Sequence, residues 1–356
     1  MTETATTTRS SLEFGEFLKK YSIVFILLGF VILLGIITEG RFLQLQNLLN
    51  VIVQVAPIGI IGLGMMAAII TKGIDLSVGA TAALAAVVAA SLAQPPGPNT
   101  FIRDLPALPI FVSVLAALAV GTLVGTIVGS LVAVFRIPPF VATLGMMTAA
   151  RGAANLYTDG RPISGTAWNF NLIGQGVTPI IILVLAAGVM WFVLNRTRFG
   201  RHVYAIGGNE MAAKVSGISV PKTHLKIYAL IGLLAGLAGV ILTARTGSGA
   251  PAYGNMMELD VITATVIGGT SFNGGIGTVW GVMVGTLIIG VINNGLSLLN
   301  VSPYWQMVVK GGIIVIAIII DERKNRSRTR ASVPVVTTTS VRGCVAYMRR
   351  APSPHR

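Results

Sequence analysis

The stretch "ALPIFVSVLAALAVGTLVGTIVGSLVAVF" (residues 107–135) contains no Asp, Glu, Lys or Arg. A helix needs about 20 mainly apolar residues to cross the hydrocarbon core of a bilayer, so this stretch predicts a membrane-spanning helix. The rest of the chain has a composition to match. Hydrophobic residues make up 53% of its 356 residues and charged residues only 11%, whereas an ordinary soluble domain has about 25% charged residues. The sequence therefore predicts an all-α integral membrane protein.

Apolar runs on both sides of this stretch bring the expected number of spans to about ten. The first run lacks a small-residue cleavage site, so it is expected to be a first span rather than a cleavable signal peptide. The eighth run is short, and the run 47–93 has room for a broken helix around Thr71–Gly73. The expected spans are residues 21–38, 47–70, 74–93, 107–135, 138–157, 177–195, 225–246, 257–272, 275–299 and 304–320.

Lys and Arg are spread unevenly between the expected loops. Positively charged loops stay on the cytoplasmic side of a membrane. With the N-terminus inside, the inside segments hold twenty of the 26 Lys and Arg residues and the outside segments hold four, while Arg151 and Lys310 fall within spans. The sequence therefore predicts that both termini are cytoplasmic and that residues 196–224 form the main cytoplasmic loop.

Three regions follow from this pattern. Residues 1–20 are expected to form a cytoplasmic tail and residues 21–322 the transmembrane domain. Residues 323–356 are basic and rich in Thr, Ser and Pro, with little apolar pattern, which predicts a disordered cytoplasmic tail.

Several kinds of chemistry have no motif in this chain. It contains no G-x-x-x-x-G-K-[ST], no H-E-x-x-H and no G-x-S-x-G stretch. Its single cysteine, Cys344, excludes an intrachain disulfide and a multi-cysteine metal site. No basic and aromatic segment resembles a nucleic-acid module, despite a net charge of +14. We expect no catalytic residue, no metal site and no nucleic-acid partner, so any uphill transport must draw its energy from another protein.

Glycine recurs at four-residue spacing within expected spans, as in "GTLVGTIVG" (121–129) and "GVMVG" (281–285). Small residues at this spacing let helix backbones approach closely in lipid. The pattern predicts helix packing, with flexibility used in gating as the alternative.

Three stretches together resemble the permease subunits of bacterial ABC importers for simple sugars, the ribose/xylose type of the branched-chain transport permease family. They are "TKGIDLSVGATAAL" (71–84), "GGNEMAAKVSGI" (207–218), and "ELDVITATVIGGTSFNGGIGTVWGVMVGTLIIGVINNGLSLL" (258–299) followed by "YWQMVVKGGIIVIAIIID" (304–321). The resemblance spans roughly residues 20–322. Lys72 stands where the family usually has Gly, and Ile276 where many members have Arg.

The resemblance implies a set of partners. Such a permease pairs with a second copy or a paralogue in the bacterial inner membrane, surrounded by the lipid bilayer. It binds a cytoplasmic ABC ATPase, which carries the ATP and Mg, so this chain itself would bind no cofactor. A periplasmic sugar-binding protein would deliver a monosaccharide or similar polyol. The alternatives are a branched-chain amino acid permease and a carrier or channel that works alone.

The resemblance also places the ATPase-docking segment in the main cytoplasmic loop. Glu210, Ala212, Ala213 and Gly217 match the Glu-Ala-Ala-spacer-Gly pattern of importer permeases. The alanines favour a short helix that exposes a small surface, and Gly217 permits a left-handed stop. Asn209 is the expected N-cap, and Pro221 is expected to prevent the helix from continuing. An ordinary solvated loop is the alternative.

Two further groups of residues are candidates for the translocation path or for structural roles. Asp75 and Ser77 either cap the start of the third span or lie at an interrupted helix beside the path. Asn293 and Asn294 either face a hydrophilic path or form hydrogen bonds between helices.

Lys310 is expected deep in the last span, where a lysine costs about 2.5–3.5 kcal/mol on insertion scales. It should pair with a carboxylate, and Glu258 and Asp260 are the nearest candidates in the expected topology.

Overall fold

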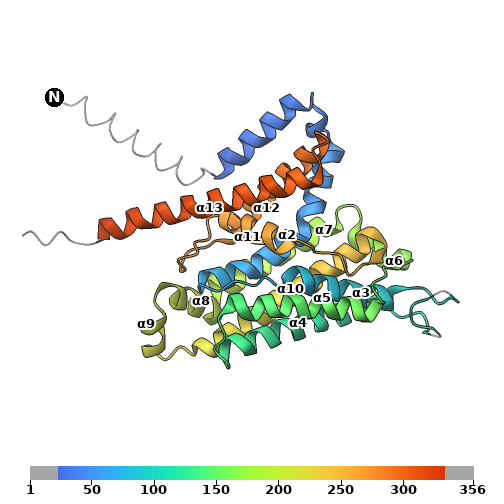
Figure 1. Ribbon diagram of the computed structural model, residues 1–356, viewed down its shortest axis with the longest axis horizontal. Coiled ribbons are helices and arrows are strands. Elements are labelled where there is room, and N and C mark those ends of the chain that lie inside the picture. The colour runs from blue at the N-terminus through green and yellow to red at the C-terminus, as the bar shows by residue number, and fades with distance from the viewer. Residues whose placement is uncertain (1–22, 99, 104, 333–356) are drawn as a thin grey trace, which may run out of the picture.

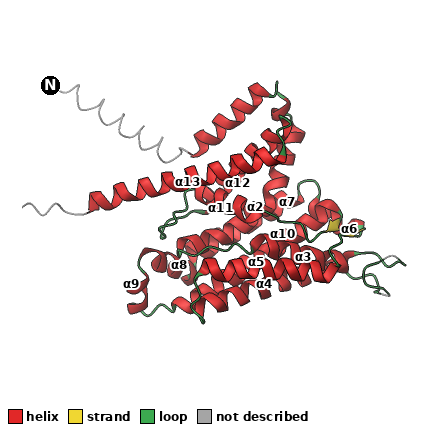
Figure 2. Cartoon of the chain, viewed as in Figure 1, coloured by secondary structure: helices red, strands yellow, loops and turns green. Residues whose placement is uncertain are grey.

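The computed structural model describes residues 23–332 except Asn99 and Asp104. The expected tail 1–20 and residues 333–356 lie outside the described part. Within it the chain is almost wholly helical, with two short strands (Figure 2). In chain order the elements are a helix Ile23–Ile37, η1 (Arg41–Leu43), α2 (Leu45–Ile70), α3 (Val78–Ala93), α4 (Ile110–Ala133), α5 (Pro139–Thr158), β1 (Ile163–Ser164), α6 (Trp168–Asn171), η2 (Leu172–Gly174), α7 (Thr178–Arg196), α8 (Arg198–Gly208), α9 (Glu210–Val215), α10 (Val220–Thr246), β2 (Ser248–Gly249), α11 (Met257–Ile267), α12 (Val279–Leu298) and α13 (Pro303–Ser332).

Each of the ten expected spans overlaps a helix. Among the described residues, α2, α4, α7, α10 and α12 are long and apolar enough to cross a membrane, so the all-α membrane fold is confirmed. The helices Ile23–Ile37 and α3 are apolar but shorter. The count of ten crossings stays a prediction.

The eighth expected span, 257–272, was wrong as a continuous crossing helix. Helix α11 has only 11 residues, which at 1.5 Å per residue is about 16 Å, or half of a hydrocarbon core that is about 30 Å thick. Residues 250–256 before it are not helical. The apolar run was long enough to suggest a full span, although it contains a short helix that follows non-helical backbone.

The expected break around Thr71–Gly73 is present, because α2 ends at Ile70 and α3 begins at Val78. Lys72 lies within this break with a φ of +62°. This left-handed backbone costs a non-glycine residue about 1–2 kcal/mol. Its geometry explains why Gly is usual at this place in the proteins that the sequence resembles.

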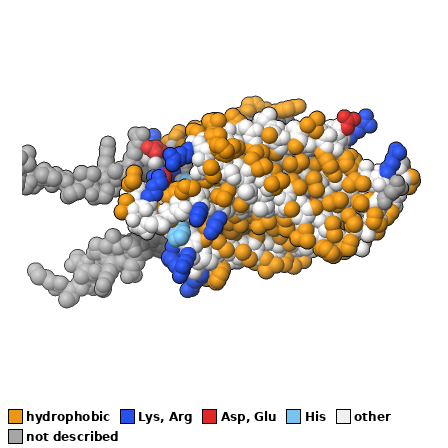
Figure 3. All heavy atoms as spheres, turned by 90° about the horizontal axis from the view of Figure 1, so that it is seen from below, with side chains coloured by type: hydrophobic (Ala, Val, Ile, Leu, Met, Phe, Trp, Pro, Cys, Tyr) orange, Lys and Arg blue, Asp and Glu red, His pale blue; other side chains and the backbone are white. Residues whose placement is uncertain are grey.

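The bundle has two distinct ends. At one end, Gly275 N donates to Ile70 O at 2.9 Å, and Tyr204 of α8 donates to Gly277 O at 2.8 Å. At the other end, β1 and β2 form a two-stranded antiparallel ladder. Figure 1 shows α9 and α6 at these opposite ends, and Figure 3 shows apolar side chains between them, with the larger group of Lys and Arg at the α9 end.

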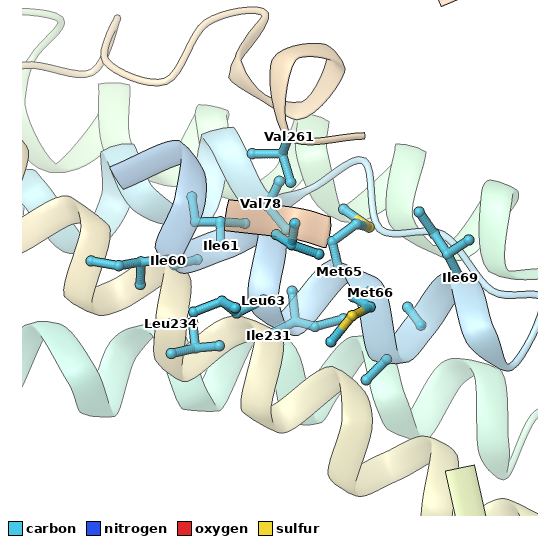
Figure 4. Packing of buried hydrophobic residues seen from close by; sticks show 14 of the residues in the cluster. Ile60, Ile61, Leu63, Met65, Met66, Ile69, Val78, Ile231, Leu234 and Val261 are labelled. Atoms are coloured by element: carbon cyan, nitrogen blue, oxygen red, sulfur yellow. The ribbon is translucent and has the colours of Figure 1, made fainter. Parts of the chain in front are cut away.

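Helix α2 lies at the centre of the bundle. Figure 4 shows its side chains packed against α3, α10 and α11, through Val78, Ile231 and Val261. In the most apolar 18-residue window of α2, 83% of the residues are buried, against 28% in α4 and in α7. Helices α4 and α7 instead expose large apolar side chains such as Leu115, Leu123 and Phe192. Such a large exposed apolar surface indicates contact with lipid.

Glycines join α4 to α10 at the spacing that predicted packing. A Cβ at Gly121 would overlap the carbonyl oxygen of Gly232, and a Cβ at Gly125 would overlap that of Tyr228. Likewise, a Cβ at Gly285 of α12 would overlap Ala264 O of α11. The prediction of close helix packing is confirmed at both motifs.

Helix α13 continues beyond the boundary predicted for the transmembrane domain. Residues 323–332 were expected to be disordered, but they extend the helix to Ser332. This segment contains Lys and Arg, which are good helix formers, and no Gly or Pro.

Candidate functional site

The loop 196–224 forms two helices, α8 and α9, at one end of the bundle (Figure 1). Helix α8 is held against the bundle by Gly207, where a Cβ would overlap Ile70 O. Helix α9 begins with Asn209, whose Oδ1 accepts a hydrogen bond from Ala212 N at 3.0 Å. Asn209 therefore caps the helix as its sequence position suggests.

The end of α9 is fixed by a Schellman motif. Gly217 is left-handed, with a φ of +83°. Gly217 N donates to Lys214 O, and Ile218 N donates to Ala213 O, both at 3.0 Å. This is the bond pattern that satisfies the last carbonyls of a helix.

The two alanines of α9 have different surroundings. Ala213 is buried against Ile206 and Val220, so its expected place on the docking surface is wrong, and it anchors the helix instead. Ala212 is exposed, together with Met211 and Val215, which are 69% and 84% exposed. Sequence reasoning did not single out Met211 and Val215, although apolar residues four apart on a short helix were a usable signal.

Pro221 has a different role from the expected one. Helix α9 already ends at Val215, and Pro221 lies in the first turn of α10. Proline is favoured there because its missing N–H has no partner within the helix. It therefore helps to begin α10 rather than to stop α9.

Glu210 and Lys214 form an ion pair along α9, with Lys214 Nζ 2.8 Å from Glu210 Oε1. The hydrogen bond from Lys214 lowers the pKa of Glu210 below its usual value. Both side chains are about half exposed, so the pair contributes only about 0.3–0.5 kcal/mol to the helix.

Asp75 and Ser77 form an Asx turn just before α3, and no side chain caps the first turn of that helix. Asp75 Oδ1 accepts hydrogen bonds from Ser77 N at 2.8 Å and from Ser77 Oγ at 2.6 Å. Both residues are buried, at 2% and 1% exposure. Neither lines the pocket beside Lys72 and His224 or the pocket beside Arg151 and Asn255. This geometry favours the structural interpretation.

The paired asparagines of α12 contact other helices. Asn294 exchanges two amide hydrogen bonds of 3.0 Å with Asn47 of α2. Asn293 lies beside Asp260 of α11, and its Oδ1 is buried without a hydrogen-bond partner among the described residues.

Lys310 of α13 lies against α11, with its Nζ 2.9 Å from Asp260 Oδ2. Glu258 lies elsewhere, beside Gly79 at the start of α3 and within electrostatic reach of Arg151. The geometry therefore distinguishes the two carboxylates that the sequence left as alternatives.

Arg151 was not assigned a role by sequence reasoning. It lies on α5, and its Nη1 donates to Pro251 O and, at 2.7 Å, to Tyr253 O. An arginine within an apolar span was the available signal, because such residues are costly and are usually functional.

A central apolar helix, an exposed apolar band and interrupted helices define a multi-spanning membrane permease. The chain belongs to the family described as the permease component of branched-chain amino acid transport systems, which matches residues 47–318.

Several relatives match most of the chain. The ribose import permease protein RbsC of Bacillus subtilis (strain 168) is 41% identical over 331 residues, covering 91% of this chain and 99% of the relative. The galactose/methyl galactoside import permease protein MglC of Haemophilus influenzae is 41% identical, with coverage of 87% and 96%. The ribose import permease protein RbsC of Escherichia coli (strain K12) is 42% identical, with coverage of 84% and 93%. No solved structure gives a significant match.

Proposed function

We propose that this chain is the membrane-spanning permease subunit of an ATP-driven importer and that it forms the path for a monosaccharide or similar polyol. The observation that carries this proposal is the 41–42% identity to ribose and galactose import permeases over most of their length. The family description also names branched-chain amino acids, which makes an amino acid the second candidate cargo.

The exposed side of α9 supports docking of a cytoplasmic ATPase. Met211, Ala212 and Val215 present apolar surface beyond the apolar band, at the end where Lys and Arg gather (Figure 3). Lipid does not cover this end in the expected topology, so a protein partner is the natural cover for exposed Met and Val side chains. Both ends of the helix are capped, so it offers a preorganised contact.

The ATPase would bind ATP and Mg, and the permease would catalyse no covalent step. Nucleotide binding would favour one of two states of the permease assembly, through differential contacts with each state. The assembly would contain two copies of this chain, or this chain and a paralogue. A periplasmic sugar-binding protein would dock at the end that carries β1 and β2.

The expected topology completes the proposal. The chain would lie in a bacterial inner membrane, with both termini and α9 in the cytoplasm. In this orientation the Lys310–Asp260 pair lies inside the bilayer, where pairing offsets part of the cost of each charge.

Uptake assays with labelled ribose, galactose and leucine test the proposed cargo. The chain would be expressed with its ATPase and binding protein in cells that lack their own transporters for these compounds. We expect ATP-dependent uptake of a sugar that an excess of leucine does not reduce. Uptake of leucine alone would replace the sugar by the second candidate, and uptake without the ATPase would contradict the importer class.

A further inference from the structure

The backbone between β2 and α11 enters the bundle without forming a helix. Gly249 packs against Ala86 of α3, and Gly254 packs against Gly79, near the start of the same helix. The segment therefore follows α3 over seven residues, a distance of roughly 10 Å. It extends from the strand-bearing end of the molecule toward its middle.

Non-helical backbone at membrane depth has unpaired polar groups, so it is tolerated only inside protein or beside a water-filled cavity. Arg151 supplies part of the missing pairing, because its Nη1 donates to the carbonyls of Pro251 and Tyr253. Tyr253 N donates to Ala250 O at 3.0 Å, which closes a turn in the segment. Arg151 thus positions this backbone from a neighbouring helix.

A pocket of about 390 Å³ lies between α5 and this segment, within the range of small-molecule sites. Its polar side chains are Arg151, Asn155 and Asn255. No Asp or Glu lines it. An amide pair and a guanidinium offer donors and acceptors for hydroxyl groups.

The polar groups of the pocket have capacity left for a ligand. Among the described residues, the side-chain hydrogen bonds of Arg151 involve only Nη1, so its Nη2 and Nε donors are available. Asn155 Nδ2 donates to Arg151 O at 2.8 Å. The Asn155 side-chain oxygen therefore remains available to accept a hydrogen bond from a ligand.

We propose that this pocket is a carbohydrate-binding subsite on the translocation path, in which Arg151, Asn155 and Asn255 bind the hydroxyl groups of a neutral sugar. The ligand class rests on the proposed function, whereas the access of water to the pocket rests on the geometry alone. Binding here should be weak, because cargo on a path must also leave it.

Cysteine labelling separates these two parts of the proposal. Cys344 is the only cysteine, so Cys344→Ala gives a background in which single cysteines can be introduced. Ala250→Cys and Ala252→Cys place a thiol in the pocket and keep its three polar side chains, and Leu115→Cys is the control on the apolar outer face of α4. A membrane-impermeant thiosulfonate reagent would be applied to proteoliposomes that hold the permease with its ATPase, with and without the sugar that the background variant transports.

We expect the two pocket cysteines to react at least ~10 times faster than the control, because the thiolate that reacts forms poorly in apolar surroundings. We also expect the transported sugar, and not leucine, to slow the reaction in a concentration-dependent way. Reaction no faster than at Leu115→Cys would overturn the aqueous path. Fast reaction without protection by a sugar that the background transports would overturn the subsite and leave the proposed function standing. If the background transports no sugar, the proposed function and the ligand class fall together.

Discussion

Gly217, which ends α9, allows a test in which backbone conformation is the main variable. Its φ is +83°, and a Cβ there would meet no atom within 4 Å. A Cβ added at this position therefore meets no steric clash. Left-handed backbone costs most residues about 1–2 kcal/mol, but Asn adopts it more readily. Gly217→Val and Gly217→Asn thus form a matched pair: both add a side chain, but only Asn tolerates the left-handed φ at this position.

The strain in Gly217→Val acts on a helix with little stability of its own. Helix α9 has 6 residues, whereas isolated helices shorter than about 12–15 residues are marginal in water. A penalty of about 1–2 kcal/mol lowers the folded population by a factor of up to roughly 5–30. If only the folded helix binds the ATPase, the apparent affinity falls by the same factor.

The affinity would be measured by titrating the purified permease in lipid nanodiscs with its ATPase, alongside ATP-driven uptake in proteoliposomes. We expect Gly217→Val to weaken association within this range, and Gly217→Asn to bind nearly as well as the unchanged chain. Because α9 lies beyond the apolar band, the amount of inserted protein should be equal in both. Equal affinity of the two variants would refute a role for the cap in docking and would leave the loop with a topological role only.

Four further predictions address the rest of the chain. Lys310→Met should lower the amount of assembled protein in detergent extracts, since breaking a buried pair costs about 3–5 kcal/mol. Adding Asp260→Asn should restore part of this amount, whereas recovery with Glu258→Gln instead would contradict the pairing. Gly125→Leu should prevent α4 from packing on α10 and reduce thermal stability, whereas Gly145→Ala, where a Cβ meets nothing within 4 Å, should leave the melting temperature unchanged. Reporter fusions at residues 210 and 165 should report opposite sides of the membrane, and the same side for both would exclude the topology. A stop codon after Ser332 should leave uptake near normal, and loss of membrane assembly would show that residues 333–356 have a structural role.

The periodic and compositional features of this protein could be predicted from its sequence. Apolar runs placed most of the helices to within a few residues, with α11 and α13 as the exceptions, and glycines four apart marked the α4–α10 contact. These signals are local, because span length and small-residue spacing follow from bilayer thickness and helix geometry. The length of α11 could not be predicted in this way, because a short buried helix and a full membrane span have the same apolar composition.

The choice between alternative partners depended on three-dimensional packing. Sequence order made Glu258 and Asp260 equal candidates for Lys310, and only the rotation of α11 places Asp260 toward α13. The same limit applied to Ala212 and Ala213, which are adjacent on α9 but face solvent and the bundle respectively. Arg151 received no assignment because its partners are backbone carbonyls, which carry no signature in the sequence.

The central place of α2 has a consequence for how the protein is made. Most of the helices that enclose it, including α7, α10, α11 and α12, are synthesised long after it. During translation, the surface of α2 that later packs against these helices is therefore in contact with lipid. The most apolar 18 residues of α2 have a mean hydropathy of 2.1, so their contact with lipid costs little, since lipid tails are as apolar as the side chains that replace them. The close contacts that Gly62 and Gly64 make with α12 and α10 can form only after those helices are inserted, so the native contacts of this early helix are among the last to form.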